Sequence, residues 1–477
     1  MARLRILCIA VMVLASFASI PHASAQVDDH VWIGGTGNQQ WQVDTNWDLG
    51  MFPNDPGRVD SDMTVILPVE GANLSVNLAA NLNLDVGATD VTIASLTMGS
   101  TSGAVTTNIT SSGGRLVFEN LELNNTTDPD NTICAFNCGN AQISSGGVAG
   151  ATNTISAIVG VSDHIDVIGA TPITFAGGIE EMGSEDGTRP VSLRAKAGTT
   201  IYITGNVLTR NMPIPVGDST EDLPLAFNTE PDSDGTIDIS GVISGAGRIR
   251  YGSSASNAPL PFPTTIVRGS NTYSGRTFIS RGNLVLAHNN ALGTGDVKHD
   301  GPAQGSLQTG YNILSDSDDR VIANTMIMAQ WQTIKGEHSL EWSGITYQDN
   351  ARGWINMLPA GKTLTLSGGQ FPNHTEEDPP PPGRNLKFDG TGKTIITGGL
   401  HDEWSTQSQT MNPGNYIGTF RFRGTGSVHI SGTASTYSGS TIVQGGNVHF
   451  ATSAHYGGTS GIVSTAGAVG VDAGVAG

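Results

Sequence analysis

The sequence is poor in charged and aromatic residues, which make up 14% and 6% of its 477 residues. A coiled coil or helical bundle would need far more charge, so the composition argues against both. Disorder is also disfavoured, because short runs of Val, Ile, Leu and Thr recur along the whole chain. Glycine is abundant instead, with 63 residues. This composition predicts many short strands separated by tight turns.

Cysteine is scarce too, with three residues in all. Cys8 lies in the apolar N-terminal segment, which leaves Cys134 and Cys138 for the rest of the chain. In an exported protein so close a pair predicts a small disulfide loop. Two free thiols or half of a metal site are the alternatives, and no second cysteine pair exists to complete a zinc site.

Beyond the N-terminus, no apolar run reaches the length of a membrane span. Residues 1–25 combine a basic start (MARLR), an apolar stretch and the small-residue ending PHASA. This pattern predicts a secretory signal peptide cut between Ala25 and Gln26, and therefore an extracellular or cell-surface protein. An uncleaved membrane anchor is the alternative. The mature chain is expected to lack a membrane span.

Basic residues are few, 23 against 42 acidic ones, and the net charge is −19. A surface this acidic repels nucleic acid and anionic lipid, so neither is an expected partner. It tolerates cations, and calcium could bind at the acidic clusters 127–131, 230–235 and 315–320. Solvated turns are the alternative for each cluster, and no other cofactor is expected.

What the sequence does contain is a set of short alternating segments, such as TIYITG, TIDISG and TLTLSGG, each ending at glycine. Alternation of this kind indicates a half-buried strand. Strands this short cannot bury an apolar face alone, but stacked coils would cover one another and share a core. The pattern therefore predicts an all-β fold, a right-handed parallel β-helix (a solenoid) with inserted loops.

Two long units repeat within the chain. The segment around Tyr273 matches the one around Tyr437, and AGTTIYITG at Ala197 matches AGKTLTLSG at Ala360. Weaker matches link ITFAGGI with LEWSGI, and Asn153 with Asn324. Internal repetition of this kind is typical of solenoids.

The repeats divide the chain into segments. We expect a Trp-rich capping segment at 26–70, first coils at 71–152, long units at 153–300 and 324–462, a connecting coil at 301–323 and an incomplete, truncated coil at 463–477. Exposed tryptophans that stack on sugars are the alternative for the first of these. The Pro-rich stretches 223–235, 258–265 and 376–384 are expected to leave the rod as loops.

The repeated segment also resembles a known family. GVISGAG followed by SNTYSGRTFISRGNLVLAHNNALGTG is similar to the autotransporter-associated β-strand repeat. In the second copy Ser435 replaces the asparagine, and HYGGTS replaces the final ALGTG. The matching positions are Asn271, Thr272, Tyr273, Ser274, Gly275, Thr277, Gly282, Leu284, Leu292, Gly293 and Gly295 in the first copy, and Thr436, Tyr437, Ser438, Gly439, Thr441 and Gly446 in the second.

The resemblance implies an exported, elongated β-helical passenger with a structural or adhesive role. It carries no catalytic residues, and we expect no enzymatic activity. A β-helix that binds or cleaves polysaccharide is the alternative, with surface glycans or other cells as partners. The two tyrosines are expected to occupy equivalent places, each packed at a turn between strands.

Overall fold

The computed structural model describes most of the chain from residue 90 onward and four short strands before it. The described residues are 29–31, 39–40, 64–68, 74–78, 90–93, 95–99, 106–111, 113–118, 141–147, 149–162, 164–183, 191–210, 224–228, 234–252, 262–299, 311–348, 352–374, 385–405, 410–411, 418–456 and 461–471.

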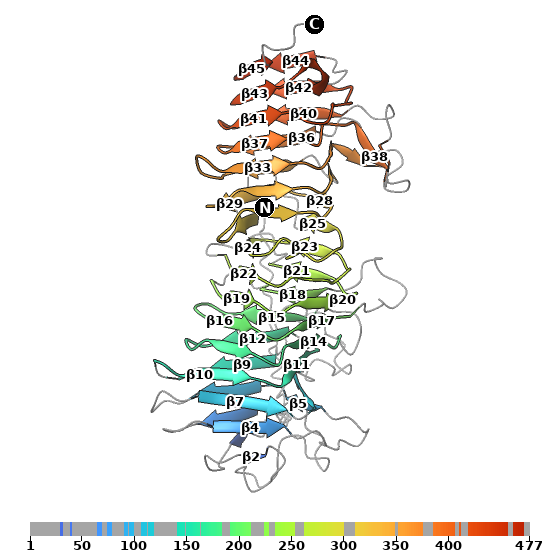
Figure 1. Cartoon of the computed structure of the whole chain (residues 1–477). Helices are drawn as coiled ribbons and strands as arrows, with labels where there is room; N and C mark the ends of the chain where they lie inside the picture. The colour runs from blue at the N-terminus through green and yellow to red at the C-terminus, as the bar shows by residue number, and fades with distance from the viewer. Residues whose placement is uncertain are drawn as a thin grey trace, which may run out of the picture.

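The described strands stack into long parallel sheets that wind along one axis (Figure 1). Sheet I has 13 strands: β1 (Asp29–Val31), β3 (Thr64–Pro68), β6 (Ser95–Gly99), β9 (Ala141–Ser145), β12 (His164–Ile168), β15 (Ser192–Ala195), β18 (Leu225–Phe227), β21 (Ile249–Tyr251), β23 (Thr277–Ile279), β25 (Val297–His299), β28 (Met326–Met328), β31 (Thr346–Gln348) and β34 (Gln370–Phe371).

Sheet II has 16 strands: β2 (Gln39–Gln40), β4 (Leu74–Leu78), β7 (Thr106–Ser111), β10 (Thr152–Ile155), β13 (Ile173–Phe175), β16 (Thr200–Ile203), β19 (Thr236–Ile239), β22 (Thr264–Val267), β24 (Gly282–Leu286), β26 (Tyr311–Ser315), β29 (Gln332–Gly336), β32 (Gly353–Asn356), β36 (Asn385–Gly390), β40 (Thr419–Phe422), β42 (Ser440–Val443) and β44 (Gly461–Ser464).

The remaining strands form two shorter parallel sheets and one small side sheet. Sheet IIIa has six strands: β5 (Val91–Ile93), β8 (Arg115–Phe118), β11 (Ile158–Val161), β14 (Ile179–Glu181), β17 (Val207–Thr209) and β20 (Ile243–Gly245). Sheet IIIb has seven: β27 (Arg320–Ile322), β30 (Leu340–Trp342), β33 (Thr363–Leu366), β37 (Lys393–Ile396), β41 (Ser427–Ile430), β43 (Asn447–Phe450) and β45 (Ala468–Val471). The side sheet joins β35 (Asn373–His374), β38 (Glu403–Ser405) and β39 (Thr410–Met411), and a 3-10 helix, η3, spans Ser453–Tyr456.

The chain visits these sheets in a fixed cycle. From β9 to β20 it passes through sheet I, sheet II and sheet IIIa in turn, and each strand pairs in parallel with the strand one coil away. Among the described strands, the antiparallel pair is β38 with β39 in the side sheet. The prediction of an all-β parallel β-helix is therefore confirmed.

One continuous core fills the inside of the coils. Along β13 and β16 the inward residues Ile173, Phe175, Ile201 and Ile203 are fully buried, whereas their outward neighbours are partly exposed. This is the alternation that the sequence showed, because successive strand residues point to opposite faces. Every coil thus covers the apolar residues of the next one.

Glycine is required where the coils turn. At Gly169 the backbone has a φ of 128°, and an added Cβ would lie 1.9 Å from the carbonyl oxygen of Ser145 in the coil before it. No other residue fits such a corner without moving the neighbouring coil.

A second, smaller apolar cluster lies on the outer side of sheet I. Ile327, Tyr347 and Phe371 come from β28, β31 and β34, and each is at most 5% exposed. The ring of His401 stacks on Phe371 with 5.0 Å between centroids. Close to this cluster the side sheet leaves the rod, where β38 projects in Figure 1.

Several sequence predictions fall outside the described residues. These are the cleavage site at Ala25 and Gln26, the pair Cys134 and Cys138, the acidic cluster 127–131, the loop 376–384, most of the Trp-rich segment, and parts of the loops 223–235 and 258–265. The prediction that 223–235 leaves the rod as a loop is wrong for Leu225–Phe227, which form strand β18 of sheet I. No helix in the described part of the chain is long and apolar enough to cross a membrane.

Candidate functional sites

The first copy of the repeat signature takes the place of a strand. Thr272 N–H donates to the carbonyl oxygen of Ile243 at 2.9 Å, and Ser274 N–H donates to that of Gly245 at 3.0 Å, so this segment stacks directly on β20. In the next coil, Thr294 N–H donates to the carbonyl oxygen of Tyr273 at 2.9 Å. Two coils of stacked loop therefore continue the face on which sheet IIIa ends.

Sheet IIIb resumes that same face. The N–H of Val321 in β27 donates to the Asn289 side chain at 3.1 Å, and the Asn324 amide donates to the carbonyl oxygen of Gly295 at 2.7 Å. Sheets IIIa and IIIb are thus two parts of one third face, separated by the repeat signature.

Tyr273 anchors this loop from within. Its ring is fully buried, and its hydroxyl lies 2.5 Å from Thr277 Oγ1. The Thr277 hydroxyl donates to the carbonyl oxygen of Leu292 at 3.1 Å, in the next coil. Burial raises the pKa of Tyr273 above its ordinary value, so the hydroxyl stays protonated.

Asn271 joins the coils on either side. Its Oδ1 accepts the N–H of Ile243 at 2.8 Å, and its Nδ2 donates to the carbonyl oxygen of Ala291 at 2.7 Å. The side chain is 1% exposed, so these bonds satisfy backbone groups that water cannot reach.

The second copy repeats the contact inside the loop. Tyr437 is also fully buried, its hydroxyl bonds to Thr441 Oγ1, and its ring meets the edge of Phe420 with 4.8 Å between centroids. Burial raises the pKa of Tyr437 to about 12. Thr436 N–H donates to the carbonyl oxygen of Leu400 at 2.8 Å, as Thr272 does to Ile243.

The partners around the second copy differ. Ser435 Oγ accepts the N–H of Leu400 at 3.2 Å, while its own N–H donates to the carbonyl oxygen of Ala454 at 3.0 Å. Asp402 is 4% exposed and accepts hydrogen bonds from the N–H of Ser438 at 2.9 Å and of Gly418 at 2.8 Å. A carboxylate thus does here what the carbonyl of Gly245 does in the first copy.

The two copies also lie on different faces of the rod. The strands that follow the first copy, β23 and β24, belong to sheets I and II, whereas β42 and β43 belong to sheets II and IIIb. Leu400 forms a bridge with Gln370 of β34, so the second copy stacks where sheet I ends. The expectation that the two tyrosines occupy equivalent places is confirmed for the contacts inside each loop. It is wrong for the face of the rod on which each loop lies.

Other repeated segments shift in the same way. Strands β13 and β16 lie in sheet II, while their matches β30 and β33 lie in sheet IIIb. The weak sequence match between the segments that begin at Asn153 and Asn324 does not follow this rule. It aligns β10 of sheet II with the region of β28 of sheet I. The long repeat therefore spans a whole number of coils plus one further face of the rod.

The other positions of the signature support the turns. Leu284 and Leu292 are buried, and Thr272, Ser274, Thr436 and Ser438 are exposed. Gly275 lies so close to the preceding coil that a Cβ would meet the oxygen of Gly247 at 2.1 Å. Positive φ angles occur at Gly282, Gly293 and Gly446, a Cβ at Gly295 would meet the oxygen of Gly275, and Gly439 is buried.

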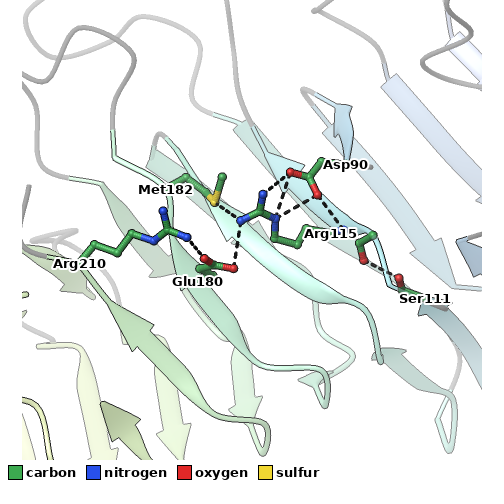
Figure 2. A network of polar contacts seen from close by, with 7 residues as sticks. Asp90, Ser111, Arg115, Glu180, Met182 and Arg210 are labelled. Carbon is green, nitrogen blue, oxygen red and sulfur yellow. Dashed lines mark hydrogen bonds and ion pairs between the residues drawn. The ribbon is translucent and has the colours of Figure 1, made fainter. Parts of the chain in front are cut away.

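A ladder of ion pairs follows sheet IIIa (Figure 2). Arg115 lies between two acids, with Nε 3.0 Å from Asp90 Oδ1 and Nη1 3.1 Å from Glu180 Oε2. Arg210 pairs with Glu180 from the other side. Each acid is thus held by a guanidinium from another coil, and Arg115 of β8 reaches across β11 to Glu180 of β14.

Glu181, the residue after Glu180, is the most unusual acid in this region. It is 1% exposed, and its Oε2 accepts the N–H of Arg210 at 2.8 Å. Burial raises its pKa to about 7. A perturbed acid can mark an active site, but a polymeric substrate cannot reach a carboxyl group enclosed to this degree.

The structure describes only some residues of the acidic clusters that could bind calcium. Asp316 is engaged by Arg320, with Nη2 2.6 Å from its Oδ1, and Asp234 accepts the N–H of Gly198 at 2.7 Å. Within the described ranges no three His, Cys, Asp or Glu side chains come together as metal ligands.

Sequence reasoning missed these ion pairs, although a signal was present. Asp90 and Arg115 are 25 residues apart, Asp166 and Arg194 are 28 apart, and another such pair is 30 apart. That separation is one coil, so opposite charges at this spacing on outward positions indicate a pair across neighbouring strands.

The fold places the chain in the class of parallel β-solenoids. Comparisons with protein-family models, with curated proteins and with solved structures found no match. The repeat signature and its stacking are therefore the features from which a function can be argued.

Proposed function

We propose that this protein is an exported, elongated β-helical rod of the autotransporter-associated repeat type, with a structural or adhesive role. The observation that carries the proposal is sheet II, whose 16 parallel strands run from β2 to β44. At ~4.8 Å per strand, that stack is roughly 75 Å long. Such a rod suits the presentation of a surface away from its point of attachment.

The outer surface supports the same role. Among the described residues, large apolar side chains are exposed at few places along the rod, as at Tyr202, Leu208 and Met357, and three more, Ile462, Val463 and Val471, lie in its last two strands. Many charged side chains are paired with the neighbouring coil, as in Figure 2. This pairing strengthens the stack and leaves the described carboxylates of the ladder without the free pair that polysaccharide cleavage requires.

Display on a non-adherent bacterium would test the adhesive role. Cells that display the chain should attach to host or biofilm surfaces more than cells that display an unrelated β-helix of similar length. Equal attachment would contradict an adhesive role. Release of new reducing ends or unsaturated sugars from polysaccharides would contradict the prediction that the protein has no enzymatic activity.

A further inference from the structure

A column of cations lies on the outer side of sheet II. Strand register aligns Gly353 of β32 with Lys387 of β36, and Lys387 with Arg421 of β40. Arg352 precedes Gly353, and Arg423 lies directly after the end of β40, two positions beyond Arg421. We name Arg352, Lys387, Arg421 and Arg423 the cationic column. Its side chains are at the surface and partly exposed.

An aromatic ring supports two members of the column. Lys387 Nζ lies 5.6 Å from the centroid of the Trp331 ring, and Arg423 Cζ lies 6.0 Å from it. Trp331 is 6% exposed, and these two side chains lie against its ring. Gly353 has no side chain to separate the ring from Lys387. The ring thus holds both charged groups at the surface without neutralising them.

The members of the column are close enough to repel one another. Burial lowers the pKa of Lys387, and Arg352, Arg421 and Arg423 lower it further. Asp389 Oδ2 lies 3.5 Å from Arg423 Nε and offsets part of the positive charge. Among the described residues, the buried Nε of Arg421 has no hydrogen-bond partner. That nitrogen is closed to a polymer, so the outer nitrogens of the partly exposed guanidinium groups are the ones that can donate to an anion.

The column contrasts with the rest of a chain whose net charge is −19. Four cations gather here on neighbouring coils, whereas Arg268, directly after β22, has two acids beside it, Asp238 at 2.8 Å and Asp316 at 3.6 Å. Clustered cations on an acidic surface bind anions locally, while the surrounding charge repels long, dense polyanions such as nucleic acid. An acidic sugar polymer, which carries its charges further apart, fits this distribution.

We propose that the cationic column binds carboxylate or sulfate groups of an acidic polysaccharide. Neighbouring strands place cations ~4.8 Å apart, so two of them can reach one anionic group. The proposal rests on the adhesive function above and names the ligand class that such adhesion would use.

Binding to immobilised polygalacturonate and κ-carrageenan, a polymer with one sulfate in each disaccharide, with neutral dextran for comparison, tests the proposal. The full chain should bind both polyanions and not dextran, and the affinity should fall as salt rises. The double variant Lys387→Gln/Arg421→Gln should lose about tenfold or more in affinity. Arg268→Gln is the matched control for the single variant Arg423→Gln, since the two side chains are 43% and 38% exposed and each has an acid beside it, and the control should change affinity by less than about twofold.

Circular dichroism checks that each variant is folded, and Arg423→Gln replaces the double variant if that one is not. Equal losses in the control and the column variants, equal binding to dextran, or preference for DNA would overturn the proposal. If displayed cells adhere but the column variants adhere equally well, the ligand assignment fails and the adhesive role stands. If no displayed cells adhere while polyanion binding depends on the column, the adhesive role fails and the binding site stands.

Discussion

The two copies of the repeat signature share their inner contacts and differ in nearly everything outside them. In both, the hydroxyl of a buried tyrosine hydrogen-bonds to a threonine four residues later. In both, the N–H of the threonine before the tyrosine donates to a backbone carbonyl oxygen of the preceding coil. Yet the first copy interrupts the third face and the second stacks where sheet I ends. The comparison shows that the signature is a local unit, able to replace a strand on more than one face.

The differences show how the same stack is made from other groups. Asn271 joins two coils through its side chain, whereas Ser435 uses its hydroxyl for one bond and its backbone for the other. Asp402 replaces a backbone carbonyl as the acceptor for the serine N–H. A departure from the family pattern is thus compensated by the neighbouring coil.

The largest effect is expected from removing the shared anchor. Tyr273→Ala and Tyr437→Ala should each lower the free energy of unfolding by about 3 kcal/mol, because each leaves a cavity in the core. Tyr→Phe at either position should cost about 1 kcal/mol, the value of one hydrogen bond. Urea unfolding followed by circular dichroism measures both. If one copy tolerates alanine, the two are not the same unit.

The next largest effect should be confined to the second copy. Asp402→Ala leaves the N–H groups of Ser438 and Gly418 without their acceptor and should cost about 2 kcal/mol. Asp234→Ala is the control, because Asp234 also accepts a backbone N–H but at an exposed site. Urea unfolding should show little change for the control. Equal costs would mean that Asp402 is not an anchor.

Exchanging the differing residue sharpens the comparison. Asn271→Ser should retain an acceptor for the N–H of Ile243 and lose the bond to the carbonyl oxygen of Ala291, at a cost of about 1 kcal/mol. Asn271→Ala loses both bonds and should cost more. Thermal unfolding of the two variants would rank them, and an equal loss would show that the hydroxyl does not substitute for the amide.

The smallest effect is a pH dependence of the second copy. His401 is buried, stacks on Phe371 and bonds through Nδ1 to Thr436 Oγ1. Burial lowers its pKa below the ordinary 6.5, although Gly398 and Asp402 act in the opposite direction. The unfolded chain therefore takes up a proton first as pH falls below about 6.5, and stability falls by at most about 1.4 kcal/mol per pH unit.

Hydrogen exchange, expressed as protection factors, would locate this effect. Protection around Thr436 should fall between pH 7.5 and 5.5, and the variant His401→Gln should lose this fall. The variant should keep the fall near β25 that His299 causes, since burial lowers the pKa of His299 to about 3. A uniform fall along the rod would show that His401 is not its source.

The sequence was sufficient for the fold because each strand carries its own alternation and its own glycine. It was insufficient for the face on which a repeat lies. Coil length varies widely, from the 19 residues between Thr264 and Asn283 to the 47 between Ser95 and Gln142. Because the loops differ so much in length, a number of residues cannot be converted into a number of faces. The 164-residue offset between Tyr273 and Tyr437 therefore does not show on which face the second copy lies.

The candidate sites were predicted less completely for a similar reason. The buried tyrosines lie within a continuous motif, whereas the cationic column joins residues from three strands and about 70 positions of sequence. Only the strand register brings Arg352, Lys387 and Arg421 together. A pattern spread over coils of unequal length leaves no local signal.

A disulfide test addresses the one-face shift most directly. His429 and His449 are register partners in sheet IIIb, with 3.1 Å between their Nδ1 atoms. Cysteines at 429 and 449 should therefore form a disulfide under mild oxidation, since neighbouring parallel strands bring Cα atoms within disulfide range. If the second copy instead lay on the same faces as the first, β43 would extend sheet II. Cysteine at 449 would then bond to cysteine at 421 and not at 429, which would contradict the account.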